Sequence, residues 1–438
     1  TTTKRGRAVS TPWPASAEEG LIQQRNDFPT AFSGWGQSAT GVTQVCNLSR
    51  QVAGTCTLDS ISSFNLFKDP STRPFGNGNR EKYGLQLSGG TESLRYFTSL
   101  DYEEEVGPVK MPQADIDFAS AHNQLLRPEW VHPNMLSRVS SRLNLNATVT
   151  PKLDLALSSG FIQLDQRLPQ TDNNTFGLFS HAYGGAGYKY QISPGDTTFG
   201  GRPKMGYRAL TPGEIFRATT REDVNRFIGS LNASWRPLAW MSNRATVGDD
   251  YSAQEDDNIC RLNECPGSAT RILGSVNNNR VSFYNYTVDL ASSANFQPLA
   301  WLNSKTTAGL QYVNTRTDQN SAGGNTLPPG AQTVSAAAVN TSGEATGLSK
   351  TLGLFVEETG AIRDRLFLTA ALRTDQNSAF GTDFQRVFYP KLSASYIISD
   401  EDYFPKPAWL DRLRLRSSFG SAGVQPNSND ALRFFVSS

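Results

Sequence analysis

Apolar and polar residues alternate along much of this chain. In the segment 138–149, Val139, Leu143 and Leu145 alternate with arginine, serine and asparagine residues, and similar patterns cover 280–296 and 411–420. A period of two is typical of a β-strand with one apolar face. Each run extends over about ten residues or more, whereas strands of globular sheets usually have about five or six. The length suits tilted strands that cross a bilayer.

The alternating segments predict about twelve to fourteen strands joined by connections of two sizes. The expected strands are 80–90, 92–104, 136–150, 152–166, 222–236, 241–254, 280–296, 301–317, 348–359, 363–375, 386–398 and 411–420, with two more near 9–24 and 429–437. Tight turns follow every second strand, and the long polar connections 105–135, 167–221, 255–279 and 318–347 lie between them. Segments 376–385 and 399–410 depart from this rhythm. Because a sandwich has no need for such an order, we expect an all-β antiparallel transmembrane barrel with short periplasmic turns and long extracellular loops.

A weak internal repeat marks two of the tight turns. Residues 232–248 match residues 293–309, and in both copies a strand ends on an aromatic residue before a Pro-Leu-Ala-Trp turn. Rings that are apolar at one end and polar at the other prefer the headgroup level of a bilayer. The predicted interface aromatics are Trp235, Trp240, Phe296 and Trp301. The alternative is that these rings cap a soluble core.

Composition is compatible with a membrane barrel and argues against one class of partner. Lys plus Arg number 41 and Asp plus Glu 40, so the net charge is +1, which argues against nucleic-acid binding. Mean hydropathy is −0.43, as expected when only every second strand residue faces lipid. The four cysteines form two close pairs in polar segments. We expect two loop disulfides, Cys46 with Cys56 and Cys260 with Cys265, in preference to free thiols.

The sequence offers little catalytic chemistry. Its three histidines, His122, His132 and His181, fall in expected loops without the spacing of metal ligands. The acidic runs at 101–105 and 255–257 are interpreted as solvated strand ends, with calcium binding as the alternative. We therefore expect no enzymatic activity, no resident metal and no cofactor.

Three stretches resemble a known family. They are TTTKRGR at 1–7, YGLQLSGGTESLRYFTSLDYEEEVGPV at 83–109, and the segment 352–423, which contains GLFVEETGAIRDRLFLTAALRTDQNSAFG and WLDRLRLRSSFGSAG. In order and pattern they resemble the SusC/RagA group of TonB-dependent outer-membrane transporters. The resemblance implies a 22-stranded barrel that holds an N-terminal plug. Residues 1–7 would end the plug and residues 8–438 would form the N-terminal part of the barrel, with the rest of the plug and the last strands expected outside this sequence.

The resemblance also implies a function. The expected protein imports a nutrient such as an oligosaccharide or a peptide across the bacterial outer membrane, driven by the TonB–ExbB–ExbD complex. A surface lipoprotein resembling SusD would act as a lid, and outer-membrane lipids would surround the barrel. The competing hypotheses are a passive porin or structural barrel without energy coupling, and a hydrolase carried on a barrel, which the few histidines disfavour.

Two sets of residues are candidates for contacts within such a transporter. Loop aromatics suit sugar faces because they bury apolar C–H surface, and the candidates are Trp130, Tyr183, Tyr188 and Tyr190. Arginines opposite the lipid-facing positions should face the lumen, since arginine in hydrocarbon costs roughly 2–4 kcal/mol. These are Arg138, Arg142, Arg373, Arg412, Arg414 and Arg416. They would pair with plug carboxylates or, alternatively, bind anionic groups of the substrate.

Overall fold

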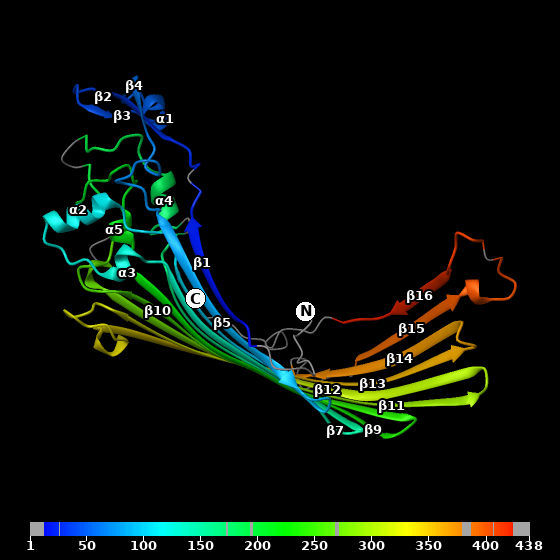
Figure 1. Ribbon diagram of the computed structural model, residues 1–438. Coiled ribbons are helices and arrows are strands. Elements are labelled where there is room, and N and C mark those ends of the chain that lie inside the picture. The colour runs from blue at the N-terminus through cyan, green and yellow to red at the C-terminus, as the bar shows by residue number, and fades with distance from the viewer. Residues whose placement is uncertain are drawn as a thin grey trace.

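The computed structural model describes residues 13–25, 27–171, 174–192, 196–267, 271–378, 387–405 and 407–423. Its main feature is one long, curved antiparallel sheet of 13 strands (Figure 1). The strands pair in the order β1-β5-β6-β7-β8-β9-β10-β11-β12-β13-β14-β15-β16, so almost every strand pairs with its neighbour in sequence. Among the described residues, the edge strands β1 and β16 each pair on one side only.

All twelve expected strands are present, and most are longer than the alternation alone suggested. The sheet consists of β1 (Ala15–Gln23), β5 (Asn77–Gly90), β6 (Leu94–Val106), β7 (Met135–Thr150), β8 (Leu153–Leu168), β9 (Thr219–Leu238), β10 (Met241–Cys260), β11 (Ser275–Leu299), β12 (Leu302–Asn325), β13 (Val339–Ile362), β14 (Leu366–Asn377), β15 (Val387–Ile397) and β16 (Arg414–Gly420). The strand expected near 9–24 is β1. The strand expected near 429–437 and the plug end expected at 1–7 lie outside the described residues.

The register gathers the apolar positions on one face of the sheet. Residues that oppose each other on neighbouring strands share a face. One such row runs across seven strands from β7 to β13 and contains Leu145, Leu157, Leu231, Val247, Val288, Tyr312 and Leu352. A row on the other face contains Ser158, Ser230, Gly248, Thr287, Val313 and Thr351. A slip of one residue would exchange the two faces, so the apolar pattern fixes the register.

The long connections gather at one end of the sheet, at the left and upper left of Figure 1. They carry the short helices α1 (Leu48–Val52), α2 (Gln113–Ala121), α3 (Pro128–Val131), α4 (Leu178–Tyr183) and α5 (Pro212–Ile215), and the 3-10 turns η1 (Arg271–Leu273) and η2 (Val334–Ala336). A third turn, η4 (Ile398–Asp400), follows β15 at the other end. Among the described residues, no helix combines the length and apolar character that a membrane span needs.

Three of these connections pack into one unit, which we call the loop core. It comprises residues from 64–76, 109–131 and 176–217. The most deeply buried side chains include Phe67, Trp130, Leu210 and Ile215, each 2% exposed or less. An aromatic cluster joins Phe28 to Phe67 at 4.3 Å between ring centroids and continues to Phe179 and Tyr183. The sequence pattern predicted 105–135 and 167–221 as polar connections, but their scattered apolar residues meet in a common core.

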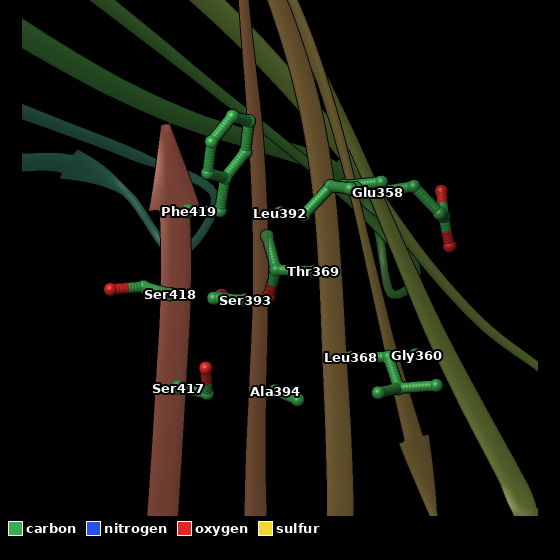
Figure 2. A pocket seen from close by; sticks show the side chains of 11 residues that line it. Glu358, Gly360, Leu368, Thr369, Leu392, Ser393, Ala394, Ser417, Ser418 and Phe419 are labelled. Carbon is green, nitrogen blue, oxygen red and sulfur yellow. The ribbon is translucent and has the colours of Figure 1, made fainter. Parts of the chain in front are cut away.

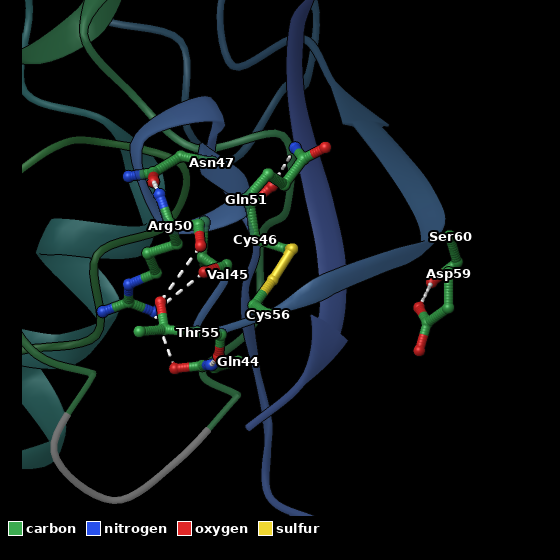
Figure 3. The surroundings of a disulfide bond; sticks show 10 residues. All are labelled: Gln44, Val45, Cys46, Asn47, Arg50, Gln51, Thr55, Cys56, Asp59 and Ser60. Atoms are coloured by element: carbon green, nitrogen blue, oxygen red, sulfur yellow. Dashed lines mark hydrogen bonds between the residues drawn. A yellow bond between two sulfur atoms is a disulfide. The ribbon is translucent and has the colours of Figure 1, made fainter. Parts of the chain in front are cut away.

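A small second sheet lies beyond the loop core. It has the order β3-β2-β4 and consists of β2 (Ala31–Gln37), β3 (Thr43–Val45) and β4 (Thr57–Phe64). The structure pairs Cys46 with Cys56 beside it, with Cα atoms 5.8 Å apart (Figure 3). Cys260 pairs with Cys265 after β10. The structure thus brings both predicted cysteine pairs together, and their oxidation to disulfides stays a prediction.

Candidate transport surfaces

The apolar face of the sheet fits the hydrocarbon of a bilayer. Its side chains are large yet half exposed, as Leu231 (46%) and Val247 (51%) show. Phe227 and Trp235 lie eight residues apart on this face of β9. At about 3.4 Å per residue this spans about 27 Å along the strand, or about 21 Å along the membrane normal at a tilt of about 40°. The span approaches the apolar band of about 25 Å that outer-membrane barrels present to lipid.

The four predicted interface aromatics lie at the short-turn end of the sheet. Trp235, Trp240, Phe296 and Trp301 are 47–50% exposed. Trp235 and Phe296 come just before the 238–241 and 299–302 turns, and Trp240 and Trp301 lie within them. Rings in a soluble core would be covered by protein, so half-exposed rings at one level favour the membrane interpretation. Their contact with lipid headgroups stays a prediction.

A groove of about 520 Å³ opens on the same apolar face near its β16 edge (Figure 2). Leu368, Leu392 and Phe419 line it from three neighbouring strands. Glu358 lies at its side, where the hydroxyl groups of Ser304 and Thr306 donate hydrogen bonds to its carboxylate. The groove is an open depression of the apolar face rather than an enclosed cavity.

The opposite, polar face carries charged side chains that mostly pair within the wall. Glu103 of β6 is 5% exposed and forms ion pairs with Arg80 of β5 and Arg138 of β7. On β9, Arg226 donates two hydrogen bonds to Asp250 of β10, at 2.9 and 2.7 Å. Because Glu103 is buried, loss of an arginine partner would leave its charge poorly compensated, whereas the more exposed Arg226–Asp250 pair contributes little to stability.

Five of the six predicted lumen arginines occupy the polar face of a strand. Arg138 and Arg142 do so on β7, Arg373 on β14, and Arg414 and Arg416 on β16. Arg373 donates to Asp375 (2.8 Å) and Gln311 (2.9 Å), and the Arg414 guanidinium lies 6.0 Å from the centre of the Phe367 ring.

Arg412 differs from this group, because it precedes β16 and approaches Asp400 at 3.8 Å. Arg138, Arg373 and Arg412 thus have acidic partners within the chain. The alternation of apolar and polar residues cannot predict such pairing. The acidic run at 101–105 was interpreted as a solvated strand end, but its Glu103 is buried within β6 between two arginines. Sequence analysis did not single out Arg80, the second of these partners. The roles of all six arginines in plug or substrate contact stay predictions.

The predicted loop aromatics divide by exposure. Tyr183 and Tyr190 are 51% and 74% exposed at the long-connection end. Tyr188 packs on Trp35 of the small sheet at 5.0 Å. Its burial, together with the nearby Asp196 carboxylate, raises the pKa of the Tyr188 hydroxyl to about 12.

The position of Trp130 contradicts the prediction that this residue contacts a ligand. Its side chain is 1% exposed in the loop core, so it has no surface to offer a ligand. The guanidinium groups of Arg127 and Arg217 lie 5.3 and 5.6 Å from the centre of its ring. The ring is buried because α3 turns inward against the loop core, which no local pattern around residue 130 indicates.

A buried polar network holds the loop core together. The Asp115 carboxylate of α2 accepts hydrogen bonds from Arg202 (3.3 Å), the Thr211 hydroxyl (2.5 Å) and the Gly213 backbone N–H (3.0 Å). Next to it, Glu214 accepts from the Thr211 and Gly200 backbone N–H groups, completing a capping box at α5. Burial raises the pKa of both carboxyl groups. The network ties the connection after β6 to the connection after β8.

A second contact, an ion pair, anchors the loop that carries Tyr188 and Tyr190 to the loop core. The Lys189 ammonium donates to Asp69 at 2.8 Å. Burial by itself would raise the pKa of the Asp69 carboxyl, but hydrogen bonds from Lys189 and Ser71 outweigh it and lower the pKa to about 2. The Lys189–Asp69 ion pair therefore remains charged at neutral pH. Tyr188 and Tyr190 flank Lys189, so the loop that presents them is anchored at its centre.

The described residues contain no group of three or more His, Cys, Asp or Glu side chains arranged to hold a metal ion. The sheet thus has one apolar and one polar face, as the wall of a barrel does. Packed loops with exposed tyrosines cover one end of it and offer a surface for recognition.

Comparison with known proteins identifies this arrangement. The family model "TonB dependent receptor-like, beta-barrel" matches residues 163–435. TonB-dependent receptor P26 of Formosa agariphila is 22% identical over 393 residues, covering 82% of this chain and 35% of that protein. The chain therefore spans about a third of the length of this curated relative.

Solved structures share the fold. The RagAB peptide importer in its closed-closed state superimposes with a TM-score of 0.69 at 15% identity, over 98% of this chain and 49% of that one. Its open-open state gives a TM-score of 0.67 at 14% identity, over 95% and 47%. The expected fold and outer-membrane location are thus confirmed, and the chain belongs to the TonB-dependent receptor-like β-barrel family of bacterial outer-membrane proteins.

Proposed function

We propose that this chain is the N-terminal part of the barrel of an energy-coupled importer. In the whole protein, residues 1–7 would end a plug domain and residues 8–438 would begin the barrel. The TonB–ExbB–ExbD complex would act on the plug, using the inner-membrane proton-motive force. The observation that carries this proposal is the two-faced sheet, together with the family match over residues 163–435.

The cargo would be a nutrient too large for porins, such as a peptide or an oligosaccharide. A peptide is favoured by the structural likeness to the RagAB peptide importer, which extends over nearly all of this chain. The exposed Tyr183 and Tyr190 would contact it from the long-connection end, since tyrosine combines a flat apolar ring with a hydroxyl. A SusD-like lipoprotein would cover this end. No catalytic step is part of the proposal.

Uptake in living cells tests the coupling. Cells with the intact gene, a gene deletion, or the intact gene plus a protonophore would receive labelled peptide and oligosaccharide mixtures. The proposal expects uptake of one mixture to need both the gene and the proton-motive force. Gene-dependent uptake that survives the protonophore would instead establish a passive, porin-like barrel.

A further inference from the structure

A glutamate projects from the apolar face of the wall at a level inside the bilayer. Glu358 of β13 is six residues from Leu352, so both side chains lie on the same face of the sheet. It lies four residues before Ile362, where β13 ends. At about 3.4 Å per residue and a tilt of about 40°, Glu358 is about 10 Å from the short-turn end, within the apolar band. Because an ionisable side chain is costly at this depth, it indicates a functional site.

The wall supplies hydrogen bonds to this carboxylate but no counter-charge. The hydroxyl groups of Ser304 and Thr306 each donate a hydrogen bond to one of its two oxygens. In the described part of the chain, no basic side chain forms an ion pair with Glu358, whereas its neighbour Glu357 on the polar face pairs with Lys391 at 3.4 Å. A carboxylate offers about four acceptor positions. About two positions, and the whole charge, therefore remain for a partner outside the wall.

The space around the carboxylate has an apolar part and an open part. The groove of about 520 Å³ has Glu358 at one side and extends over β14 and β15 to Phe419 of β16 (Figure 2). Its volume is in the range of about 300–1,000 Å³ that proteins use for small, mostly apolar ligands. Toward the short turn, Gly360 leaves the surface open, since a Cβ atom there would meet only Leu302 at 3.8 Å. A molecule with a polar end at Glu358 and an apolar chain along the groove fits both parts.

We propose that Glu358 and the adjoining groove form a binding site for a phospholipid whose head group carries a primary ammonium. The ammonium binds the carboxylate, and one acyl chain lies along the groove. The charges are complementary, and a primary ammonium has three N–H donors for the acceptor positions that the wall leaves open. The outer membrane is thinner than most bilayers, which brings head groups closer to this depth. A quaternary ammonium lacks N–H donors and an anionic head group is repelled, so the site selects lipids by their head group.

Native mass spectrometry of the full-length protein measures this selectivity. The protein, freed of native lipid in detergent, would be titrated with phosphatidylethanolamine, phosphatidylcholine and phosphatidylglycerol that carry the same acyl chains. Phosphatidylethanolamine should bind about tenfold more tightly than the other two, since a hydrogen bond between charged groups contributes about that much. Glu358→Gln should lower its affinity about tenfold, to the level of phosphatidylcholine, because the amide can still bond to the hydroxyl groups of the wall but carries no charge.

Two further variants separate the charge from the groove. Glu357→Gln neutralises the neighbouring carboxylate on the polar face and should leave all three affinities unchanged. Ala394→Phe places a ring in the groove. It should weaken the binding of all three lipids and keep the relative advantage of phosphatidylethanolamine. The comparison of the three lipids on the parent protein needs no variant, so the test does not depend on the folding of Glu358→Gln.

Equal affinities of the three lipids for the parent protein would overturn the proposal, and so would a preference for phosphatidylethanolamine that survives in Glu358→Gln. A dimer that dissociates in Glu358→Gln, without any lipid preference in the parent, would assign the carboxylate to a contact between two copies and would also contradict the proposal. Failure of the importer function is distinguishable, because uptake that is independent of the proton-motive force would leave these lipid affinities unaffected.

Discussion

Replacement of Asp115 by alanine tests whether the loop core is a folded unit. The change removes the carboxylate that accepts hydrogen bonds from Arg202, Thr211 and Gly213. The Arg202 side chain is only 5% exposed, so its charge would stay buried without its acidic partner. Breaking a buried pair in this way costs about 3–5 kcal/mol. Local opening of α2 and α5 should therefore become about a hundredfold to a few thousandfold more frequent, at about 1.4 kcal/mol per tenfold.

Hydrogen–deuterium exchange measures this opening segment by segment. In the full-length protein in nanodiscs, amides of 113–121 and 211–216 should exchange faster by that factor, while strands β7 to β13 keep their rates. The control is Asp165→Asn, which breaks an ion pair with Arg221 whose side chains are 39% and 50% exposed. Exposed pairs are worth about 0–1 kcal/mol. Unchanged exchange in α2, or equal acceleration across the strands, would refute the loop core as a separate cooperative unit.

Three further predictions concern other parts of the molecule. In the Lys189–Asp69 ion pair, the pKa of Asp69 is lowered from 3.8 to about 2. The contribution of this pair to stability is therefore fully present above about pH 4 and is lost as the pH falls through 2. Exchange of amides 186–192 should stay constant from pH 7 to 4 after correction for intrinsic rates, and Asp69→Asn should raise it at pH 7. Leu290→Arg on the apolar face should lower the free energy of unfolding by about 2–4 kcal/mol. Unfolding would be induced by urea and monitored by the heat-modifiable gel mobility of the barrel. Thr287→Arg on the polar face should cost under about 1 kcal/mol, and equal costs would contradict the assigned faces. Serine at both Cys46 and Cys56 removes a cross-link that closes a loop of 10 residues, which should destabilise β2–β4 by about 3 kcal/mol. Amides of β2–β4 should then exchange faster with deuterium, and slower exchange would contradict the prediction.

The strands could be predicted from sequence because each follows a local rule. On β9, alternation of Leu231 and Ala233 with Ser230 and Asn232 is enough to predict a strand and its apolar face. The ends were less predictable. β11 begins at Ser275 rather than near 280, because the polar residues beyond the bilayer stay in the ladder without an apolar face to mark them.

The loop core and the small sheet could not be predicted in the same way. Trp130 is buried by contacts with residues far along the chain, such as Arg217, which is 87 positions away, and no periodic pattern connects them. The same reason hides the Asp115–Arg202 pair, whose partners are separated by 87 residues. Five of the six arginines lie on the polar face of a strand, as expected, whereas Arg412 precedes β16. Their partners depend on the register between strands: Arg138 pairs with Glu103.

The most direct test of the account is a cysteine scan of β9 in the intact protein within native outer membranes. Single cysteines at Leu231 and Ala233 should resist a water-soluble maleimide and react with a lipid-soluble one. Cysteines at Ser230 and Asn232 should contact the lumen and resist the lipid-soluble reagent. This alternation would establish a barrel wall with its apolar face in the bilayer. Equal labelling of neighbouring positions by either reagent would contradict the membrane barrel, and with it the transport function.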